Sequence, residues 1–120
     1  MANKGLLGAW GEAQAAAHYR ANGYTVVACN YRCRFGEIDL IVKNRKYLAF
    51  VEVKLRKSDA FAEAKEFVDA KKQERLRATA MLWLEEHETV LQPRFDVIEI
   101  YAENGTATKN PRINRIEDAF

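Results

Sequence analysis

Two apolar, β-branched runs with acids inside them constrain the fold of this chain most strongly. The runs are GEIDLIVK at residues 36–43 and KYLAFVEVK at residues 46–54, and only a short polar stretch around Asn44 and Arg45 separates them. Runs of this composition on either side of a turn predict two antiparallel strands joined as a hairpin. Charged side chains are rarely buried in strands unless they are paired or bind a metal, so the acids inside both runs require an explanation.

The alternation of side chains along a strand places these charges on shared faces. Glu37 and Asp39 lie on one face of the first strand, and Glu52 and Lys54 lie on one face of the second. If the connection is an even-numbered loop centred near residues 45 and 46, Asp39 lies opposite Glu52 with the Cβ atoms about 5 Å apart. An odd-numbered loop would break this match. Two carboxylates so close repel each other unless one keeps its proton or a cation lies between them, and hard divalent ions such as Mg²⁺ prefer such oxygen ligands.

The apolar neighbours of the acids separate a functional site from a solvated face. Ile41, Leu48 and Phe50 share the face of the acids. If the acids merely decorated a half-exposed hairpin, with Lys54 as a cross-strand partner, this face would be polar. The apolar neighbours instead favour a site at the end of a buried strip, in which Lys54 would polarise an attacking water or hold a phosphate.

The remaining patterns place the hairpin in one α/β domain. The predicted elements are a helix at 4–22, a strand at 24–31, a basic and aromatic connection at 31–36, the two hairpin strands, a mixed-charge connection at 56–66, a long helix that begins after Asp69, and a strand at 94–102. The tail beyond this strand has only weak signals. The order α, β, β, β, α, β, without repeats or linkers, predicts a single domain over residues 1–120.

Each predicted helix has two faces of different composition. The apolar stripe of the first helix comprises Leu6, Trp10, Ala13 and Ala17. Small residues surround Glu12 on the same helix and would let that face approach another element closely. The second helix, capped by Asp69, has an apolar stripe of Leu76, Ala80, Trp83 and Leu84 and a basic face of Lys71, Lys72, Arg75 and Arg77.

Composition limits the class of protein. A hydrophobic content of 48% in 120 residues suits a core that needs no disulfide or structural metal. Because no apolar run approaches the roughly 18 residues of a membrane span, we expect a soluble, cytoplasmic protein. Cys29 and Cys33 lack the denser ligand set of a zinc site and are expected to be reduced thiols.

Basic residues surround the acids of the hairpin. Residues 31–57 contain eight Lys or Arg against three acids, and a positive field of this kind is typical of nucleic-acid binding, although solvated cations on any surface give a weaker version of the signal. Arg32 and Arg34 lie beside aromatic residues that can stack on exposed bases, which makes them candidates for nucleic-acid contact. The basic face of the second helix is in part an ordinary solvated face, and phosphate contact is expected from Lys71 and Lys72, which are nearest its N-terminal turn.

Acids followed by E-x-K on consecutive strands, within the order α, β, β, β, α, β, resemble the PD-(D/E)XK restriction-endonuclease-like nuclease superfamily. The strings G-x-x-G-E, R-x-G-E-I-D-L-I, F-V-E-V-K-x-R, K-K-Q and R-F-D-V are similar to those of the uncharacterised bacterial YraN-type family, and the likeness covers nearly the whole chain. This resemblance implies a restriction-endonuclease-like core, with a mixed central sheet flanked by helices.

The resemblance also implies roles for individual residues. Asp39 and Glu52 would hold Mg²⁺ or Mn²⁺, and Lys54 would be the catalytic lysine. Glu12 would match the acid on the first helix that completes the metal site of archaeal Holliday-junction resolvases. Polar positions near the scissile phosphate are matched by Arg34, Arg56 and Gln73. Ile38 stands where the superfamily motif has its proline, so the motif does not narrow the substrate.

Three functional hypotheses follow. The first is a metal-dependent nuclease that hydrolyses phosphodiester bonds of DNA, with branched or otherwise structured DNA among its candidate substrates. The second is a nucleic-acid-binding protein that keeps the fold without turnover, and the third is a structural scaffold. The intact set of Asp39, Glu52 and Lys54 favours the first. Asp96 is interpreted as a structural partner of Arg94 rather than as a group behind the metal ligands. The sequence leaves open whether two copies form a homodimer.

Overall fold

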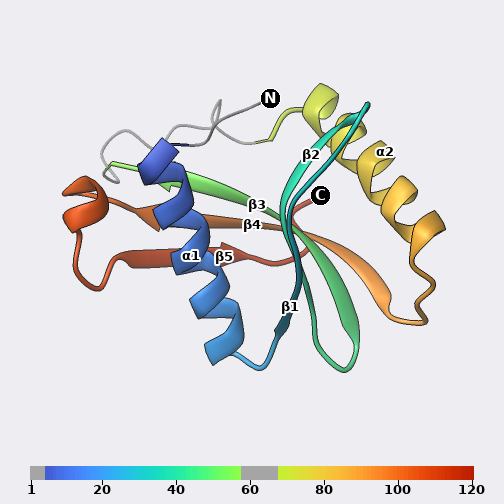
Figure 1. Ribbon diagram of the computed structural model, residues 1–120, viewed down its shortest axis with the longest axis horizontal. Coiled ribbons are helices and arrows are strands. Elements are labelled where there is room, and N and C mark those ends of the chain that lie inside the picture. Colours follow the sequence, from blue (N-terminus) through green and yellow to red (C-terminus); the bar gives the residue numbers. More distant parts are fainter. Residues whose placement is uncertain (1–4, 58–67) are drawn as a thin grey trace.

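The computed structural model describes residues 5–57 and 68–120, which form a five-stranded mixed sheet and two long helices (Figure 1). The elements are α1 (Gly5–Ala21), β1 (Thr25–Cys33), β2 (Gly36–Lys43), β3 (Tyr47–Arg56), α2 (Ala70–Glu86), β4 (Gln92–Tyr101), the 3₁₀ helix η3 (Gly105–Ala107) and β5 (Arg112–Ile116). The sheet order is β1-β2-β3-β4-β5, with β3 and β4 parallel and the other neighbours antiparallel. The predicted α/β class is confirmed, and the arrangement is consistent with a restriction-endonuclease-like core.

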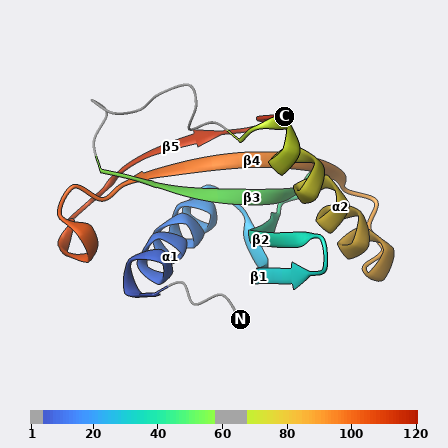
Figure 2. The same ribbon diagram turned by 90° about the horizontal axis from the view of Figure 1, so that it is seen from above.

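The two long helices lie well apart (Figure 2) and pack against opposite faces of the sheet. Because alternate residues of a strand point to opposite sides, neighbouring residues of one strand belong to different cores. Leu40 and Val51 belong to the core beneath α1, whereas Ile41 and Phe50 belong to the core beneath α2. Parallel strands require a crossover connection, and α2 lies within the crossover from β3 to β4. The sheet face that the sequence predicts to carry the acids is therefore the face against which α2 packs.

The buried face of α1 differs from the predicted apolar stripe. Leu6, Ala13 and Ala17 are exposed, and Leu6 is 86% exposed. The buried residues are instead Gly11, Ala15, Ala16 and Tyr19. The small residues allow a close approach to the sheet, since a Cβ added at Gly11 would lie only 2.7 Å from Cδ2 of Leu55 on β3. The prediction of a close-packing face of small residues next to Glu12 is confirmed, whereas the predicted stripe is wrong except at Trp10, which is partly buried against the core beneath α1.

Helix α2 follows its predicted pattern closely. The side chain of Asp69 accepts a hydrogen bond from the backbone N–H of Lys72 at 2.8 Å, which confirms the predicted N-cap. Leu76, Ala80 and Trp83 are buried as expected, Leu84 is partly buried, and Thr79 is buried as well. Lys72 is only half-exposed, unlike the rest of the predicted basic face. The predicted mixed-charge connection at 56–66 lies almost entirely outside the described residues.

Two strand predictions need correction. Strand β1 continues to Cys33, because Arg32 pairs with Glu37 and Cys33 pairs with Gly36, so the predicted connection shrinks to the two residues between them. Strand β5, at residues 112–116, was not predicted. Its sequence RINRI is short and carries two arginines, so the local pattern does not predict a strand. Hydrogen-bonded pairing with β4 stabilises the extended conformation instead.

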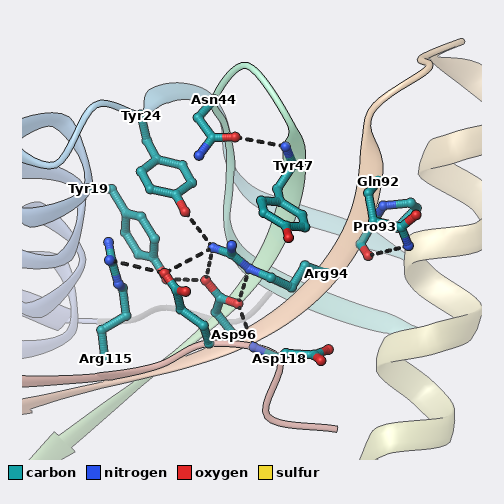
Figure 3. A network of polar contacts seen from close by, with 11 residues as sticks. Tyr19, Tyr24, Asn44, Tyr47, Gln92, Pro93, Arg94, Asp96, Arg115 and Asp118 are labelled. Atoms are coloured by element: carbon teal, nitrogen blue, oxygen red, sulfur yellow. Dashed lines mark hydrogen bonds and ion pairs between the residues drawn. The ribbon is translucent and has the colours of Figure 1, made fainter.

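A buried polar network on the α1 side of the sheet joins α1, β4 and the C-terminal tail (Figure 3). The guanidinium of Arg94 donates two hydrogen bonds of 2.8 Å to the carboxylate of Asp96, and its Nη2 also donates to the Tyr24 hydroxyl at 2.7 Å. The Tyr19 hydroxyl and the backbone N–H of Asp118 donate to Asp96 at 2.8 and 3.2 Å. Asp96 has no exposed surface and Arg94 is 6% exposed. The prediction that Asp96 is a structural partner of Arg94 is confirmed.

Two predictions from composition concern thiols and membranes. Cys29 and Cys33 are both free thiols, as expected. Among the helices of residues 5–57 and 68–120, none has the length and apolar character needed to cross a membrane.

Candidate active site

A hollow of about 510 Å³ opens between the end of the β1-β2 hairpin, the middle of β3 and the first turns of α2. Five of the eight residues that line it are charged, three of them acids and two of them cations. The lining residues are Gly36, Glu37, Asp39, Glu52, Val53, Lys72, Arg75 and Leu76. The two acids that the sequence places opposite each other therefore lie in one hollow.

The register of the β2-β3 hairpin brings Asp39 and Glu52 together. Leu40 pairs with Val51 and Lys43 pairs with Leu48, so the loop is even-numbered, as the match between the acids requires. One step beyond the Leu40–Val51 pair, the same register places Asp39 next to Glu52. Asp39 is 8% exposed and Glu52 7% exposed. The backbone N–H of Val53 donates a hydrogen bond of 2.8 Å to Oδ2 of Asp39, which fixes that carboxylate against β3.

Two lysines face a single oxygen of Glu52. The Nζ of Lys72 donates a hydrogen bond to Oε2 of Glu52, and the Nζ of Lys54 lies 3.6 Å from the same oxygen. Lys54 reaches it because it follows Glu52 by two residues on the same strand face. Lys72 reaches it from the first turn of α2. The cap at Asp69 fixes where this helix begins, and Lys72, three residues later, lies on the side that faces the sheet.

Burial and the neighbouring acid disfavour the charge of Glu52. Burial raises the pKa of Glu52, repulsion from Asp39 raises it further, and Lys72 and Lys54 only partly oppose these effects. For Lys72, burial alone would lower the pKa, but the hydrogen bond to Glu52 and the negative charges of Glu52 and Asp39 together outweigh burial and raise it. The expected rise in the pKa of one crowded carboxylate is therefore confirmed for Glu52.

The donor set fits a hydrated divalent ion rather than a closed protein cage. Within the two described ranges, no three His, Cys, Asp or Glu side chains are grouped closely enough to hold a metal ion. Mg²⁺, however, commonly keeps several waters and binds through one or two carboxylates together with a substrate phosphate. Asp39 and Glu52 provide two such carboxylates in a hollow that is open to solvent.

Glu12, the third predicted metal ligand, lies on α1. Its Oε1 accepts a hydrogen bond of 3.0 Å from the side-chain amide of Asn30 on β1. It is half-buried, and it is not among the residues that line the hollow. A role for Glu12 in metal binding stays a prediction.

Of the predicted nucleic-acid contacts, Arg32 and Arg34 lie at the tip of the β1-β2 hairpin. Arg32 forms an ion pair with Glu37, which itself lines the hollow. The guanidinium of Arg34 lies over the ring of Phe35, 4.6 Å from its centroid, and Phe35 is 38% exposed. The tip therefore presents a cation and an aromatic ring next to the candidate site.

Of the other predicted nucleic-acid contacts, two lie at the hollow and two are bound to other parts of the fold. Lys72 lies in the hollow and Lys71 is exposed beside it. Arg56 forms an ion pair with Glu99 at 3.0 Å, and Gln73 donates to the Val68 carbonyl at 2.9 Å, so both already have partners in the fold.

Sequence reasoning placed Arg75 only on the basic face of the helix, but the structure places it in the wall of the hollow. Its spacing of three residues from Lys72 is the signal that could have identified it, because residues three apart lie on one helix face. The prediction for Lys72 was a phosphate contact, and its hydrogen bond to Glu52 was not foreseen.

Comparison with known proteins identifies the family. Residues 11–100 match the family described as "Uncharacterised protein family UPF0102". The chain belongs to this family. The UPF0102 protein of Nocardia farcinica is 40% identical, over 98% of this chain and 91% of its own length. The UPF0102 protein of Alkaliphilus oremlandii is 42% identical, over 95% of this chain and 97% of its own length. The predicted YraN-type membership is confirmed, and the UPF0102 match includes all four predicted catalytic residues.

Proposed function

We propose that this UPF0102 protein is a divalent-metal-dependent nuclease that hydrolyses phosphodiester bonds of DNA. The observation that supports this function most is the position of Asp39 and Glu52 in one hollow, with Lys54 and Lys72 both directed to one oxygen of Glu52. Carboxylate oxygens bind hard divalent cations, and ammonium groups bind the oxygens of a phosphate. The combination is complementary to a phosphodiester that arrives together with a metal ion.

Each residue has a distinct role in this proposal. Asp39 and Glu52 would hold Mg²⁺ or Mn²⁺ through their carboxylate oxygens, and Glu12 is the candidate for a third ligand. A metal ion held there would supply an activated water and would neutralise charge on the phosphate. Lys54 stabilises the charge that develops on the phosphate oxygens during in-line attack. Lys72 exchanges its contact with Glu52 for one with a non-bridging phosphate oxygen.

The surroundings of the hollow favour DNA as the substrate. Arg75 lines the hollow, Lys71 is exposed beside it, and the tip of the hairpin carries Arg34 against Phe35. Cations bind the phosphates, and an exposed aromatic ring can stack on a base that is not paired. These features, together with the resemblance to junction resolvases, support branched or otherwise structured DNA.

One observation favours a second candidate function, a nucleic-acid-binding protein without turnover. The ammonium of Lys72 already supplies Glu52 with a cation inside the protein. If that contact persists when DNA binds, Glu52 is not available to a metal. The basic hairpin tip would still bind DNA in that case.

A cleavage screen tests the proposed function. Purified protein is incubated with linear, forked, flapped and four-way DNA in Mg²⁺ or Mn²⁺, beside Glu52→Ala, Lys54→Ala and the exposed control Lys43→Ala. We expect cleavage by the wild type and by Lys43→Ala. Lys54→Ala should lose at least about 100-fold in rate while DNA affinity changes by only a few fold, because its interaction is made in the transition state. Binding without cleavage of any substrate by the wild type would instead select the second function.

A further inference from the structure

A second, smaller hollow of about 170 Å³ lies on the same face of the sheet, between the start of α2, strands β3 to β5 and the C-terminal residues. Its volume equals roughly five or six waters at about 30 Å³ each. The lining residues are Arg56, Val68, Gln73, Val97, Glu99, Ile116, Ala119 and Phe120. Arg56 and Gln73, which the family resemblance places near the scissile phosphate, line this hollow, whereas Asp39, Glu52 and Lys72 line the first.

The second hollow adjoins the candidate active site on two elements. Val97 on β4 pairs with Glu52 on β3, so it lies about 4.8 Å away across the sheet. Lys54 pairs with Glu99 in the same register. On α2, Gln73 directly follows Lys72. The two hollows are therefore lined by neighbouring residues of β3, β4 and α2 on one face of the sheet.

The walls of the second hollow suit a flat group. Val97, Ile116 and Phe120 supply apolar surface. The ring of Phe120 is held by stacking on Phe95, with 5.0 Å between the centroids, and by the guanidinium of Arg77, 5.5 Å from its centroid. Because these neighbours fix the ring, the surface that it leaves uncovered can contact a planar ligand without being ordered first.

The polar groups of the second hollow suit the edge of such a ligand. Glu99 is 7% exposed, and its two oxygens accept hydrogen bonds from Arg56 at 3.0 Å and from Asn114 at 2.8 Å. Because a carboxylate has about four lone-pair positions, Glu99 can accept further donors. The side-chain amide of Gln73, whose Nε2 donates to the Val68 carbonyl at 2.9 Å, also lines this hollow. Fixed donors and acceptors around an apolar slot are the features that bind a nucleobase by its faces and its edge.

We infer that the second hollow receives the nucleobase adjacent to the phosphate bound at Glu52, Lys54 and Lys72. This inference rests on the proposed function and specifies its substrate class. A paired base would have to be unstacked at a cost of a few kcal/mol before it could enter, whereas an unpaired base enters freely. The preferred substrate is thus DNA with an unpaired nucleotide next to the cut, as found at forks, flaps and frayed junctions.

The test measures binding rather than cleavage. A labelled forked DNA is prepared with one abasic site at each position of its single-stranded arm, and affinities are measured by fluorescence anisotropy in chelator. We expect loss of a single base, at one position only, to weaken binding by the wild type about tenfold, which is within the range of one base-aromatic stack. If the abasic site changes the affinity of the wild-type protein equally at every position, the inference is overturned.

Two variants connect the abasic effect to this hollow. Ala119→Leu fills it. This variant should bind intact DNA about tenfold more weakly than the wild type, and the abasic site should no longer change its affinity. Phe120→Ala removes the aromatic wall and should do the same. Val90→Leu, at a fully exposed position, serves as the matched control and should behave like the wild type. Thermal melts verify that each variant is folded. If the abasic effect persists unchanged in a folded Ala119→Leu or Phe120→Ala protein, the base lies elsewhere.

The outcomes separate this inference from the proposed function. If the protein cleaves DNA but the abasic site has the same effect at every position, the inference about the nucleobase is rejected and the proposed nuclease function stands. Failure to bind any DNA at low salt rejects both proposals.

Discussion

Two pairs of buried charged residues lie on opposite faces of the same sheet, and they are balanced in different ways. On the α1 face, Asp96 accepts two hydrogen bonds from Arg94, one from Tyr19 and one from the backbone of Asp118 (Figure 3). On the α2 face, Asp39 and Glu52 are like charges, and the cations near Glu52 are lysines on flexible stems. The first pair is complete within the protein, whereas in the proposed function the second exchanges its partners for a metal ion and a phosphate.

The pKa shifts at the two places have opposite consequences for charge. Burial opposes the charge of Arg94, but hydrogen bonds to Asp96 and Tyr24, together with the negative charge of Asp96, outweigh burial and raise the pKa of Arg94, so the fold favours its charged form. At Glu52, burial and Asp39 raise the pKa, so the fold disfavours the charged form. A buried charge that the fold favours stabilises the structure, and one that it disfavours is typical of functional sites.

Replacement of the acid at the balanced pair should have the largest effect on stability. Asp96→Asn removes the negative partner of a buried guanidinium, so we expect the free energy of unfolding to fall by about 3–5 kcal/mol, and the melting temperature by more than about 10 °C. Thermal and urea unfolding measure the change. Glu117→Ala, which removes a partly exposed carboxylate 3.7 Å from the same guanidinium, should cost much less. Equal effects of the two variants would contradict the assignment of Asp96 as the main partner.

Lys72 tests whether the second pair depends on an internal cation. Lys72→Met leaves the buried Glu52 with only Lys54 nearby, so we expect a loss of about 1–2 kcal/mol in chelator. Because a metal ion no longer competes with the ammonium, added Mn²⁺ should stabilise this variant more than the wild type. Thermal melts with chelator and with millimolar Mn²⁺ measure both effects. The matched control is Lys71→Met at the neighbouring exposed position, and a control that shifts equally would remove Lys72 from the site.

The same change from acid to amide should have the opposite sign at the crowded pair. Asp39→Asn keeps the shape and an acceptor for the N–H of Val53 but removes the repulsion on Glu52. We expect the melting temperature in chelator to rise, by an amount that corresponds to less than about 1 kcal/mol. Mg²⁺ or Mn²⁺ should stabilise the wild type and should stabilise Asp39→Asn much less. A destabilised Asp39→Asn that does not respond to metal would show that Asp39 is structural, like Asp96.

The smallest expected effect is a dependence on pH. The pKa of Glu52 is raised above its ordinary value of 4.5, so the folded protein binds this proton more readily than the unfolded chain does. The stability contributed by the neutral form is complete below about pH 4.5 and is lost as the pH rises through the folded pKa. Glu52→Gln should therefore melt a few degrees higher than the wild type at neutral pH in chelator, and the difference should disappear in acid. A difference that does not change with pH would contradict the raised pKa.

Local geometry made part of the site predictable. The distance along the chain from Asp39 to Glu52 is short, and the even-numbered loop and the alternation of side chains determine their pairing. The Asp69 cap was predictable for the same reason, because a capping side chain contacts its own first turn. The apolar stripe of α1 was not, since periodicity identifies apolar residues but does not identify the face that the sheet accepts. Here close approach of the backbone at Gly11 decided the face.

The sequence by itself determined the α/β order, the hairpin and the pairing of two acids on one strand face, because these depend on backbone periodicity and on short loops. Only the tertiary structure decided that Lys72 supplies the cation at Glu52, that Arg56 pairs with Glu99, and that β5 completes the sheet. These contacts join residues that are distant along the chain. Their partners depend on where the crossover through α2 places that helix and on which strands lie side by side in the sheet, and no local pattern in the sequence contains that information.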